Sequence, residues 1–394
     1  MSLTVGVIFG GRSVEHDVSI VTGTQFIENM DRTKYEVIPI YIAKNGIWYT
    51  GDALLDVNIY KNFNAQDKRL VKAYISPVPG EGLVQETVSG FFAKRKQISL
   101  HAAVLAMHGM HGEDGALQGL LELADIPYTS PGLVGSSVGM DKIVMKDFFA
   151  GMGLPVLESI HFLRSDDRTQ IIEKIEKALS YPVYVKPANL GSSIGISKAT
   201  DRASLENSIV VAAAYDKRIL VEKCVTDITE INCSCRGHGK DVQVSVCEQP
   251  ISWHDFLSFD DKYLRGKSSA GMKSLDRIIP APVGEDVTNQ IQDMTAHVFK
   301  ELDCKGVVRI DYIYDNSEHR LYINEINTIP GSFSFYLWEP TGLSYKALID
   351  SLIQNAIDAR AEKNASVFAY DSNILSKAGK RGTKGGLKGG KTGN

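Results

Sequence analysis

Apolar runs that alternate with helical patterns constrain the first part of the chain most strongly. They follow one another in the order 4–9, 18–30, 36–42, 102–107 and 117–124, with helical spacing in the second and the last. Strands that alternate with helices predict a parallel, doubly wound α/β sheet, which places ligand groups at the carboxyl ends of its strands. The stretch from about 60 to 100 is weakly patterned, and we expect it to carry a small insertion.

Two later changes of pattern predict further domains. The turn cluster at 127–132 ends the first segment. From 228 to 248, short runs with alternating apolar residues predict antiparallel strands, and 306–314 and 320–326 predict two more. We therefore predict an N-terminal domain, a central domain, a C-terminal domain and a tail, at 1–127, 128–230, 231–362 and 363–394. The Lys- and Gly-rich end of the tail cannot bury enough apolar surface to fold.

Composition argues against several classes of protein. The 394 residues include 43 Lys+Arg and 47 Asp+Glu, and the net charge of −4 argues against nucleic acid as the main ligand. No apolar run approaches the ~18 residues of a membrane-spanning helix, and the N-terminus lacks the features of a signal peptide. The five cysteines do not suggest a disulfide framework, and Cys233 and Cys235 fit buried thiols on a strand. We expect a cytoplasmic protein without a nucleic-acid or membrane partner.

A segment rich in glycine and serine follows the apolar run that ends at Lys186. It reads Lys-Pro-Ala-Asn-Leu-Gly-Ser-Ser-Ile-Gly over 186–195. Such a loop can turn backbone N–H groups and two hydroxyls toward a phosphate chain, to which Lys186 adds a positive charge. It is not a P-loop, because the lysine precedes the glycines. When the segment is considered alone, an ordinary hairpin with a surface lysine explains it equally well.

Two strands near the C-terminus carry a second candidate site. Alternation places Arg309 and Asp311 on one face of their strand, and it does the same for Glu325 and Asn327. If the strands pair, their oxygen ligands suit Mg²⁺ bound partly through nucleotide phosphates, although exposed salt-bridged strands have equal weight in isolation. The turn at 328–332 favours the site, because it can aim a backbone N–H there as an oxyanion donor, worth ~10²–10³ in rate.

Two turns after N-terminal strands carry further polar residues. Glu15 and Asp17 follow a Gly-Gly turn, where they either cap a helix or face a substrate ammonium; the third glycine of a dinucleotide-binding fingerprint is missing. His108 and His111 lie among glycines without cysteines, so we expect one histidine in a cleft rather than a zinc site. There is no Gly-x-Ser-x-Gly nucleophile elbow. Together these residues predict an ATP site with a metal beside a small-molecule cleft.

The motifs and their order resemble those of the D-alanine–D-alanine ligases of the ATP-grasp superfamily, over about 4–360. They occupy 9–19, 108–119, 140–142, 185–195, 221–223, 261–263, 309–311 and 324–331. The resemblance implies a three-domain fold, in which an N-terminal doubly wound parallel sheet precedes two domains that sandwich ATP. It also implies that ATP phosphorylates the carboxylate of one D-alanine and that the amine of a second attacks this acyl phosphate, for peptidoglycan precursor synthesis.

The resemblance assigns roles to individual residues. The ammonium of the first D-alanine would be held by Glu15, Ser192 and Tyr263, and His108 would lie beside its carboxylate. Arg309 and the Gly331 N–H would stabilise the oxyanion of the tetrahedral intermediate. ATP would contact Lys142, Lys186, Ser193, Glu222, Lys223, Glu230 and Lys262, with Glu230 one residue further from Glu222 than is typical. Two Mg²⁺ ions, which Mn²⁺ can replace, would bind Asp311, Glu325 and Asn327.

The acceptor is the least determined part of this reading. Tyr263 favours an amine over D-lactate. Tyr336 and Leu337 stand where the family usually has a Ser-Leu pair whose serine binds the second substrate's carboxylate. A phenol can donate the same hydrogen bond but reshapes the pocket. D-Serine or another small D-amino acid as acceptor, and a non-catalytic ATP-binding paralogue, are therefore the alternatives. The resemblance also implies that a homodimer can form.

Overall fold

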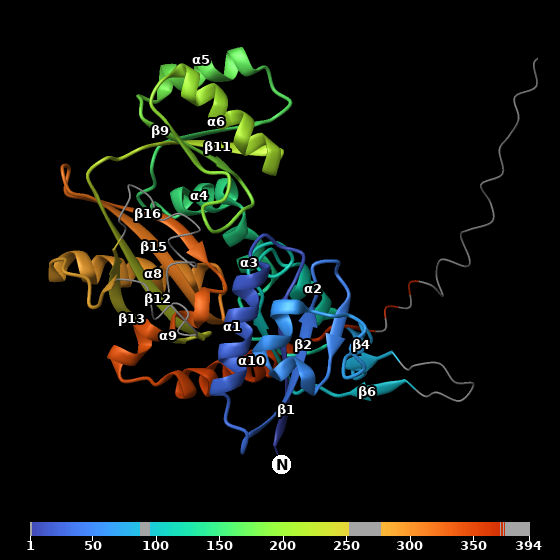
Figure 1. The fold of residues 1–394 in the computed structure, drawn as a ribbon. Helices are drawn as coiled ribbons and strands as arrows, with labels where there is room; N and C mark the ends of the chain where they lie inside the picture. The colour runs from blue at the N-terminus through green and yellow to red at the C-terminus, as the bar shows by residue number, and fades with distance from the viewer. Residues whose placement is uncertain (1, 87–94, 252–276, 371, 373, 375–394) are drawn as a thin grey trace, which may run out of the picture.

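The computed structural model describes residues 2–86, 95–251, 277–370, 372 and 374. Within them, three sheets follow one another along the chain. Figure 1 shows the first sheet in blue, the second above it in green and the third beside it in yellow to orange. The tail from 375 onward, together with Lys262 and Tyr263, lies outside the described residues.

The first sheet has seven strands in the order β6-β5-β4-β3-β2-β1-β7. Its centre follows the predicted alternation: β1 (Leu3–Gly10), α1 (His16–Asn29), β2 (Tyr35–Ile42), β7 (Ala102–Ala106) and α2 (Ala116–Leu123). β1 pairs in parallel with both β2 and β7, as a doubly wound sheet requires.

The stretch expected as an insertion supplies strands to this same sheet. The antiparallel edge consists of β3 (Trp48–Thr50), β4 (Val71–Ile75), β5 (Leu83–Gln85) and β6 (Lys96–Ile98). These strands have only three to five residues. These strands were not recognised from sequence, because strands this short show too few alternations.

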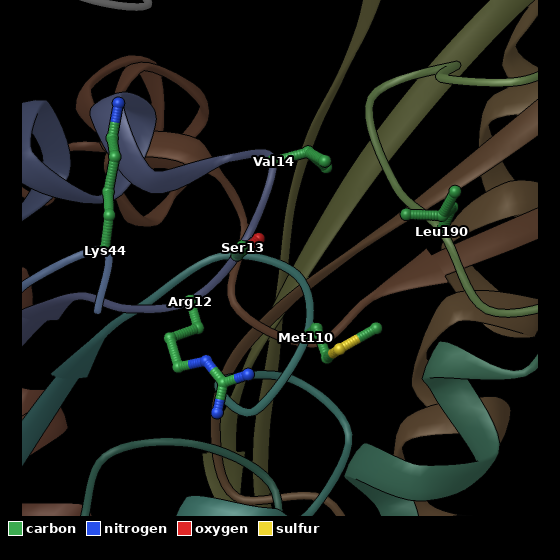
Figure 2. Close-up of a pocket in the computed structure, with 6 residues that line it drawn as sticks. All are labelled: Arg12, Ser13, Val14, Lys44, Met110 and Leu190. Atoms are coloured by element: carbon green, nitrogen blue, oxygen red, sulfur yellow. The ribbon is translucent and has the colours of Figure 1, made fainter. Parts of the chain in front are cut away.

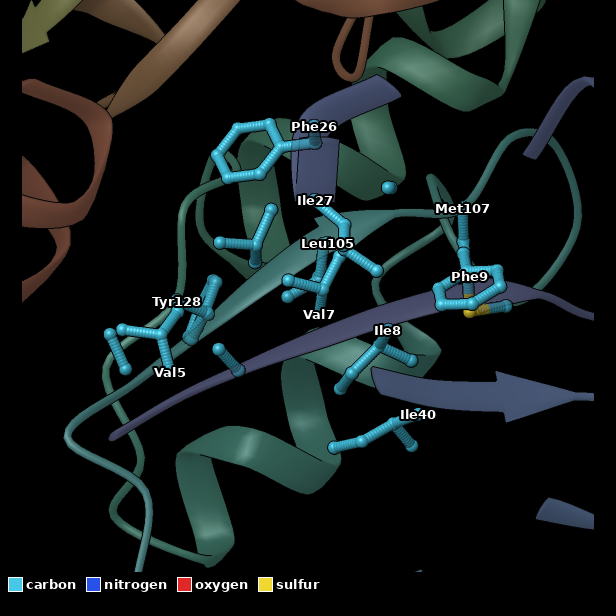
Figure 3. Close-up of a cluster of buried hydrophobic side chains, with 14 of the residues drawn as sticks. Val5, Val7, Ile8, Phe9, Phe26, Ile27, Ile40, Leu105, Met107 and Tyr128 are labelled. Carbon is cyan, nitrogen blue, oxygen red and sulfur yellow. The ribbon is translucent and has the colours of Figure 1, made fainter. Parts of the chain in front are cut away.

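The core around β1 explains why that strand is apolar without interruption. Val5, Val7, Ile8 and Phe9 are all fully buried, so both faces of the strand are covered. Figure 3 shows them packed with residues of α1, β2 and β7. The same core continues into two C-terminal helices, α9 (Phe335–Trp338) and α10 (Tyr345–Asn364). Residues from opposite ends of the chain therefore share one hydrophobic core.

The second sheet is antiparallel, in the order β10-β9-β11-β8. Its elements are α3 (Leu133–Met140), α4 (Lys142–Gly151), β8 (Ser159–Leu163), α5 (Arg168–Ala178), β9 (Val183–Pro187), β10 (Ser197–Ala199), α6 (Arg202–Tyr215) and β11 (Arg218–Lys223). Asp141 begins α4 by accepting hydrogen bonds from the N–H groups of Ile143 and Val144. This cap sets the direction in which α4 presents its lysines.

The third sheet has the order β14-β13-β12-β15-β16 and is antiparallel, as predicted. It comprises β12 (Ile228–His238), β13 (Asp241–Pro250), β14 (Arg277–Ile278), β15 (Gly306–Asp315) and β16 (Arg320–Asn327), with α8 (Glu285–Glu301) packed on it. Cys233 and Cys235 are buried thiols on β12, which confirms their predicted setting.

The predicted domain limits at 127/128 and 230/231 remain a prediction. Each sheet uses its own stretch of sequence, but the core of the first sheet also takes in α9 and α10 from the end of the chain. Of the helices described, none combines the length and the apolar character needed to cross a membrane.

Candidate active site

Glu15 and Ser192 join the first and second sheets. Glu15 precedes α1 and is buried, and the Ser192 hydroxyl donates a hydrogen bond to its carboxylate. Ser192 lies in the loop between β9 and β10, where φ is 52° at this residue and 62° at Ser193. A Cβ at residue 191 would lie 2.8 Å from Glu15 Oε2, so the carboxylate would have to shift to accommodate a larger residue there. The glycine-rich loop therefore closes on the N-terminal turn.

Lys142 connects this loop to the third sheet. Its ammonium donates to the Leu190 carbonyl at 2.8 Å and lies 3.1 Å from Glu325 Oε2. The residue is buried at the start of α4, where the Asp141 cap positions it. One lysine thus reaches both the predicted phosphate loop and the predicted metal ligands.

A buried carboxylate between two lysines forms the floor of the predicted ATP site. Glu222 on β11 pairs with Lys186 on β9 and, at 2.6 Å, with Lys146 on α4. Burial alone would raise the pKa of Glu222, but the two ammonium groups lower it overall. The pKa of Lys186 rises, because the attraction of Glu222 outweighs the effect of burial. Glu222 and Lys186 are therefore both charged, and the Lys146 side chain lies against the same carboxylate.

The Glu222 carboxylate is thus held by lysines, while its predicted contact with adenine stays a prediction. Lys223 ends the same strand, half-buried, and Glu230 lies half-buried on the neighbouring β12. Lys146 was not predicted. Its spacing of four residues from Lys142 places both on one helix face and could have indicated it.

The predicted metal ligands meet on paired strands. Asp311 of β15 lies opposite Glu325 of β16, and Arg309 lies opposite Asn327. Arg309 donates two hydrogen bonds to Asp311, at 2.6 and 2.7 Å, and the Asn327 amide donates to Asp311 at 3.0 Å. Burial would lower the pKa of Arg309, but Asp311 raises it overall. The strand pairing on which the site depends is confirmed.

This donor set fits Mg²⁺. It offers two carboxylates and an amide, which are the oxygen ligands that the ion prefers. Nowhere in the described chain do three or more His, Cys, Asp or Glu side chains gather as a metal site. A set of two carboxylates suits an ion whose remaining ligands are phosphates and water.

His108 follows β7, and its ring is buried. The imidazole Nε2 is 2.8 Å from Thr22 Oγ1 on α1, and burial lowers the pKa of His108 to about 4. Glu113, in the following loop, accepts a hydrogen bond from the Ile329 N–H at 3.0 Å. Burial, followed by the charge of Glu15, raises the pKa of Glu113 to about 8. His108 is therefore neutral near pH 7.

Tyr336 and Leu337 occupy different surroundings. The Tyr336 hydroxyl donates to Glu248 Oε1 at 3.1 Å, and the Arg277 guanidinium lies 3.7 Å from the centre of its ring. Arg277 also pairs with Glu248 at 2.9 Å. Leu337 is fully buried in the core. The Tyr336 phenol is thus bound to a buried carboxylate, a contact that the sequence did not predict.

An open cleft of about 340 Å³ lies beside the Glu15–Ser192 contact. It is lined by Arg12, Ser13, Val14, Lys44, Met110 and Leu190. Figure 2 shows Val14 and Met110 facing Leu190 of the glycine-rich loop across the gap. Val14 directly precedes Glu15 in the chain, and Leu190 belongs to the same loop as Ser192.

Fold and site together define a class of protein. The second sheet carries a glycine-rich loop and buried lysines, and the third carries an arginine with two carboxylates. The first sheet adds a buried carboxylate that touches the loop. This is the arrangement of a three-domain ATP-grasp enzyme, which uses ATP to join a carboxylate to an amine.

Similarity to known proteins identifies the family. The families described as "D-ala D-ala ligase N-terminus" and "D-ala D-ala ligase C-terminus" match residues 4–131 and 148–354. The chain is 35% identical to a D-alanine–D-alanine ligase of Thermosipho africanus, over 95% of this chain and 98% of that protein. It is 41% identical to the one of Natranaerobius thermophilus, over 92% and 97%. The chain belongs to the D-alanine–D-alanine ligase family.

Solved structures agree with this assignment. The D-alanine–D-alanine ligase of Coxiella burnetii superposes with a TM-score of 0.77 at 25% identity, covering 96% of this chain and 99% of that one. The VanG D-Ala:D-Ser ligase of Enterococcus faecalis superposes with a TM-score of 0.77 at 28% identity, covering 90% and 100%. The predicted family and three-domain fold are therefore confirmed.

Proposed function

We propose that this protein joins two D-alanines into D-alanyl-D-alanine, with ATP converted to ADP and phosphate. The observation that carries the proposal is the Glu15–Ser192 hydrogen bond, which brings a buried carboxylate onto the glycine-rich loop. A carboxylate at this point suits the ammonium of an amino acid whose own carboxylate faces ATP. Relatives named D-alanine–D-alanine ligase align with nearly the whole chain.

The residues support an acyl-phosphate route. Lys142 and Lys186 supply positive charge beside the glycine-rich loop, where the ATP phosphates would lie. Phosphorylation turns a carboxylate oxygen into a leaving group, so that the amine of the second amino acid can attack and expel phosphate. Arg309 and the Gly331 N–H would stabilise the negative oxygen that develops. Ser193, Lys223, Glu230, Lys262 and Tyr263 keep their predicted contacts within this proposal.

The metal belongs to the same proposal. Asp311, Glu325 and Asn327 would hold Mg²⁺, as two ions and with Mn²⁺ as a substitute. When bound, the metal neutralises phosphate charge. The ion pair between Lys142 and Glu325 adds a fixed cation at the same place.

D-Serine is the alternative acceptor, and the observation that favours it is the setting of Tyr336. Its hydroxyl is bound to Glu248, so the pocket for the second amino acid differs from one built around a serine. The VanG protein, which shares 28% identity, is a D-Ala:D-Ser ligase. The acceptor is therefore the part of the function that an assay must establish.

The experiment measures ADP release with Mg-ATP and D-alanine alone, and then with D-serine or D-lactate added. We expect turnover on D-alanine alone and a dipeptide product identified by mass. Glu15→Gln should raise the KM for D-alanine, whereas Asp17→Asn, at an exposed position of the same helix start, should not. Turnover only with added D-serine would identify D-serine as the acceptor. ATP binding without any turnover would indicate a non-catalytic paralogue.

Three further points rest on the same proposal. The product serves peptidoglycan precursor synthesis, which consumes a D-dipeptide. Such synthesis uses cytoplasmic ATP, so we place the protein in the cytoplasm. We also propose a homodimer, which light scattering coupled to size-exclusion chromatography tests by the mass in solution.

A further inference from the structure

The turn that contains Gly331 is held by α1, a helix that packs on the first sheet. The Ser332 N–H donates to Thr22 Oγ1 on α1 at 3.4 Å, and the Ser332 hydroxyl donates to Gln25 on the same helix at 2.6 Å. Thr22 and Ser332 are both buried. The N-terminal helix therefore contacts the residue that directly follows Gly331.

The directions of these hydrogen bonds follow from the groups available. The Ile329 N–H already donates to Glu113, so the carbonyl is the group of Ile329 that accepts from the His108 ring. A neutral ring that donates from one nitrogen must accept at the other. Thr22 therefore donates its O–H to His108 Nε2 and accepts the Ser332 N–H on the same oxygen. One threonine completes a chain from His108 to the turn.

The turn needs this support because its backbone is strained. Ser332, Phe333 and Ser334 have φ values of 50°, 55° and 50°, in the left-handed region. Non-glycine residues rarely occupy this region in succession, and they do so only where their surroundings hold them there. Phe333 packs against Phe26 of α1 with ring centroids 4.8 Å apart, so the same helix supports the turn by packing as well.

We propose that Thr22 is a positioning residue that holds the Gly331 N–H where the oxyanion of the reaction forms. Thr22 acts through the Ser332 N–H on one side of Gly331 and through His108 and the Ile329 carbonyl on the other. Because α1 also begins beside Glu15, the helix that anchors the first substrate also fixes the oxyanion donor. The inference rests on the proposed function, which places the oxyanion at Gly331.

The test compares Thr22→Val with Thr22→Ser. Valine keeps the shape but cannot hydrogen-bond, whereas serine keeps the hydroxyl. We expect Thr22→Val to lower kcat about tenfold to hundredfold, with the KM for ATP within about twofold of wild type. Thr22→Ser should recover most of kcat. Thr24→Val is the matched control, since the Thr24 hydroxyl donates only to carbonyls of its own helix at 2.8 and 3.1 Å, and its kcat should not change.

Hydrogen exchange of the segment 329–334 provides a readout that does not depend on activity. We expect about tenfold faster exchange in Thr22→Val than in the Thr24→Val control, from the loss of one buried hydrogen bond. Unchanged exchange together with unchanged kcat in Thr22→Val would overturn the inference. So would a loss of kcat in Thr22→Ser as large as that in Thr22→Val. If Thr22→Val does not fold, Thr22→Ala takes its place. If the wild-type protein shows no turnover but Thr22→Val still speeds hydrogen exchange, the proposed function is contradicted. The role of Thr22 in holding the turn is not.

Discussion

Lys146 provides the sharpest test of how the ATP site is charged. Its ammonium lies 2.6 Å from Glu222 Oε2, and both side chains are almost completely buried. Glu222 also pairs with Lys186, so two cations share one anion. Replacing Lys146 by methionine preserves most of its volume and removes its charge. The remaining pair would be neutral, and Lys186 would have no excess charge to offer phosphate.

The size of the effect follows from burial. Removing one partner of a buried ion pair lowers the free energy of unfolding by about 3–5 kcal/mol. Because Glu222 retains Lys186, we expect the lower end, about 3 kcal/mol. A charge-assisted hydrogen bond contributes about 1.5–3 kcal/mol. Since 1.4 kcal/mol is a factor of ten, the KM for ATP should rise about tenfold to hundredfold.

The assay is steady-state ADP release against ATP concentration, together with thermal unfolding. Lys177→Met, at an exposed position of α5, is the matched control and should leave both values unchanged. If Lys146→Met matches this control in ATP KM and in unfolding temperature, the argument for a shared cation at Glu222 is refuted.

Three further predictions concern the metal site, pH and the strained turn. Glu325→Gln should raise the Mg²⁺ concentration for half-maximal turnover at least about tenfold by removing a ligand charge, and near-normal turnover would contradict this. Burial lowers the pKa of His108 from 6.5 to about 4. Between these pH values the unfolded chain binds a proton that the folded chain does not, so the free energy of unfolding falls as pH falls. The contribution of His108 falls by about 2 kcal/mol between pH 7 and pH 5, so the unfolding free energy of the wild type relative to His108→Gln should fall by that amount, as urea unfolding of both proteins at both values would show. The hydroxyl of Ser334 is buried and has no partner among the described residues, and its φ is 50°, so Ser334→Gly should raise the unfolding temperature by about 1–3 °C. A lower temperature in calorimetry would mean that the turn is unstrained.

Much of the fold was predictable because its signals are local. The apolar runs at β1 and β2 appear where the periodicity placed them. The short strands β3 to β6 were missed because three to five residues carry too little pattern.

The candidate site divides in the same way. Alternation along two strands predicted that Asp311 and Glu325 would meet if the strands paired, and the structure places them opposite each other. The partner of Glu222 was not predictable in this way, because Lys146 lies on a helix that precedes β9 and β11 in the chain. Nor could the pattern show that Tyr336 would bind Glu248, 88 residues earlier.

The longer elements of this protein and the residue types that carry its chemistry were readable from sequence, because periodicity and motif spacing act over a few residues. The tertiary structure alone decided which cation neutralises which carboxylate and what holds the turn at Gly331. Thr22 and Ser332 are separated by 310 residues, yet they share a buried hydrogen bond. Hydrogen bonds and ion pairs depend on distance through space, which the packing of three sheets sets and no local pattern contains.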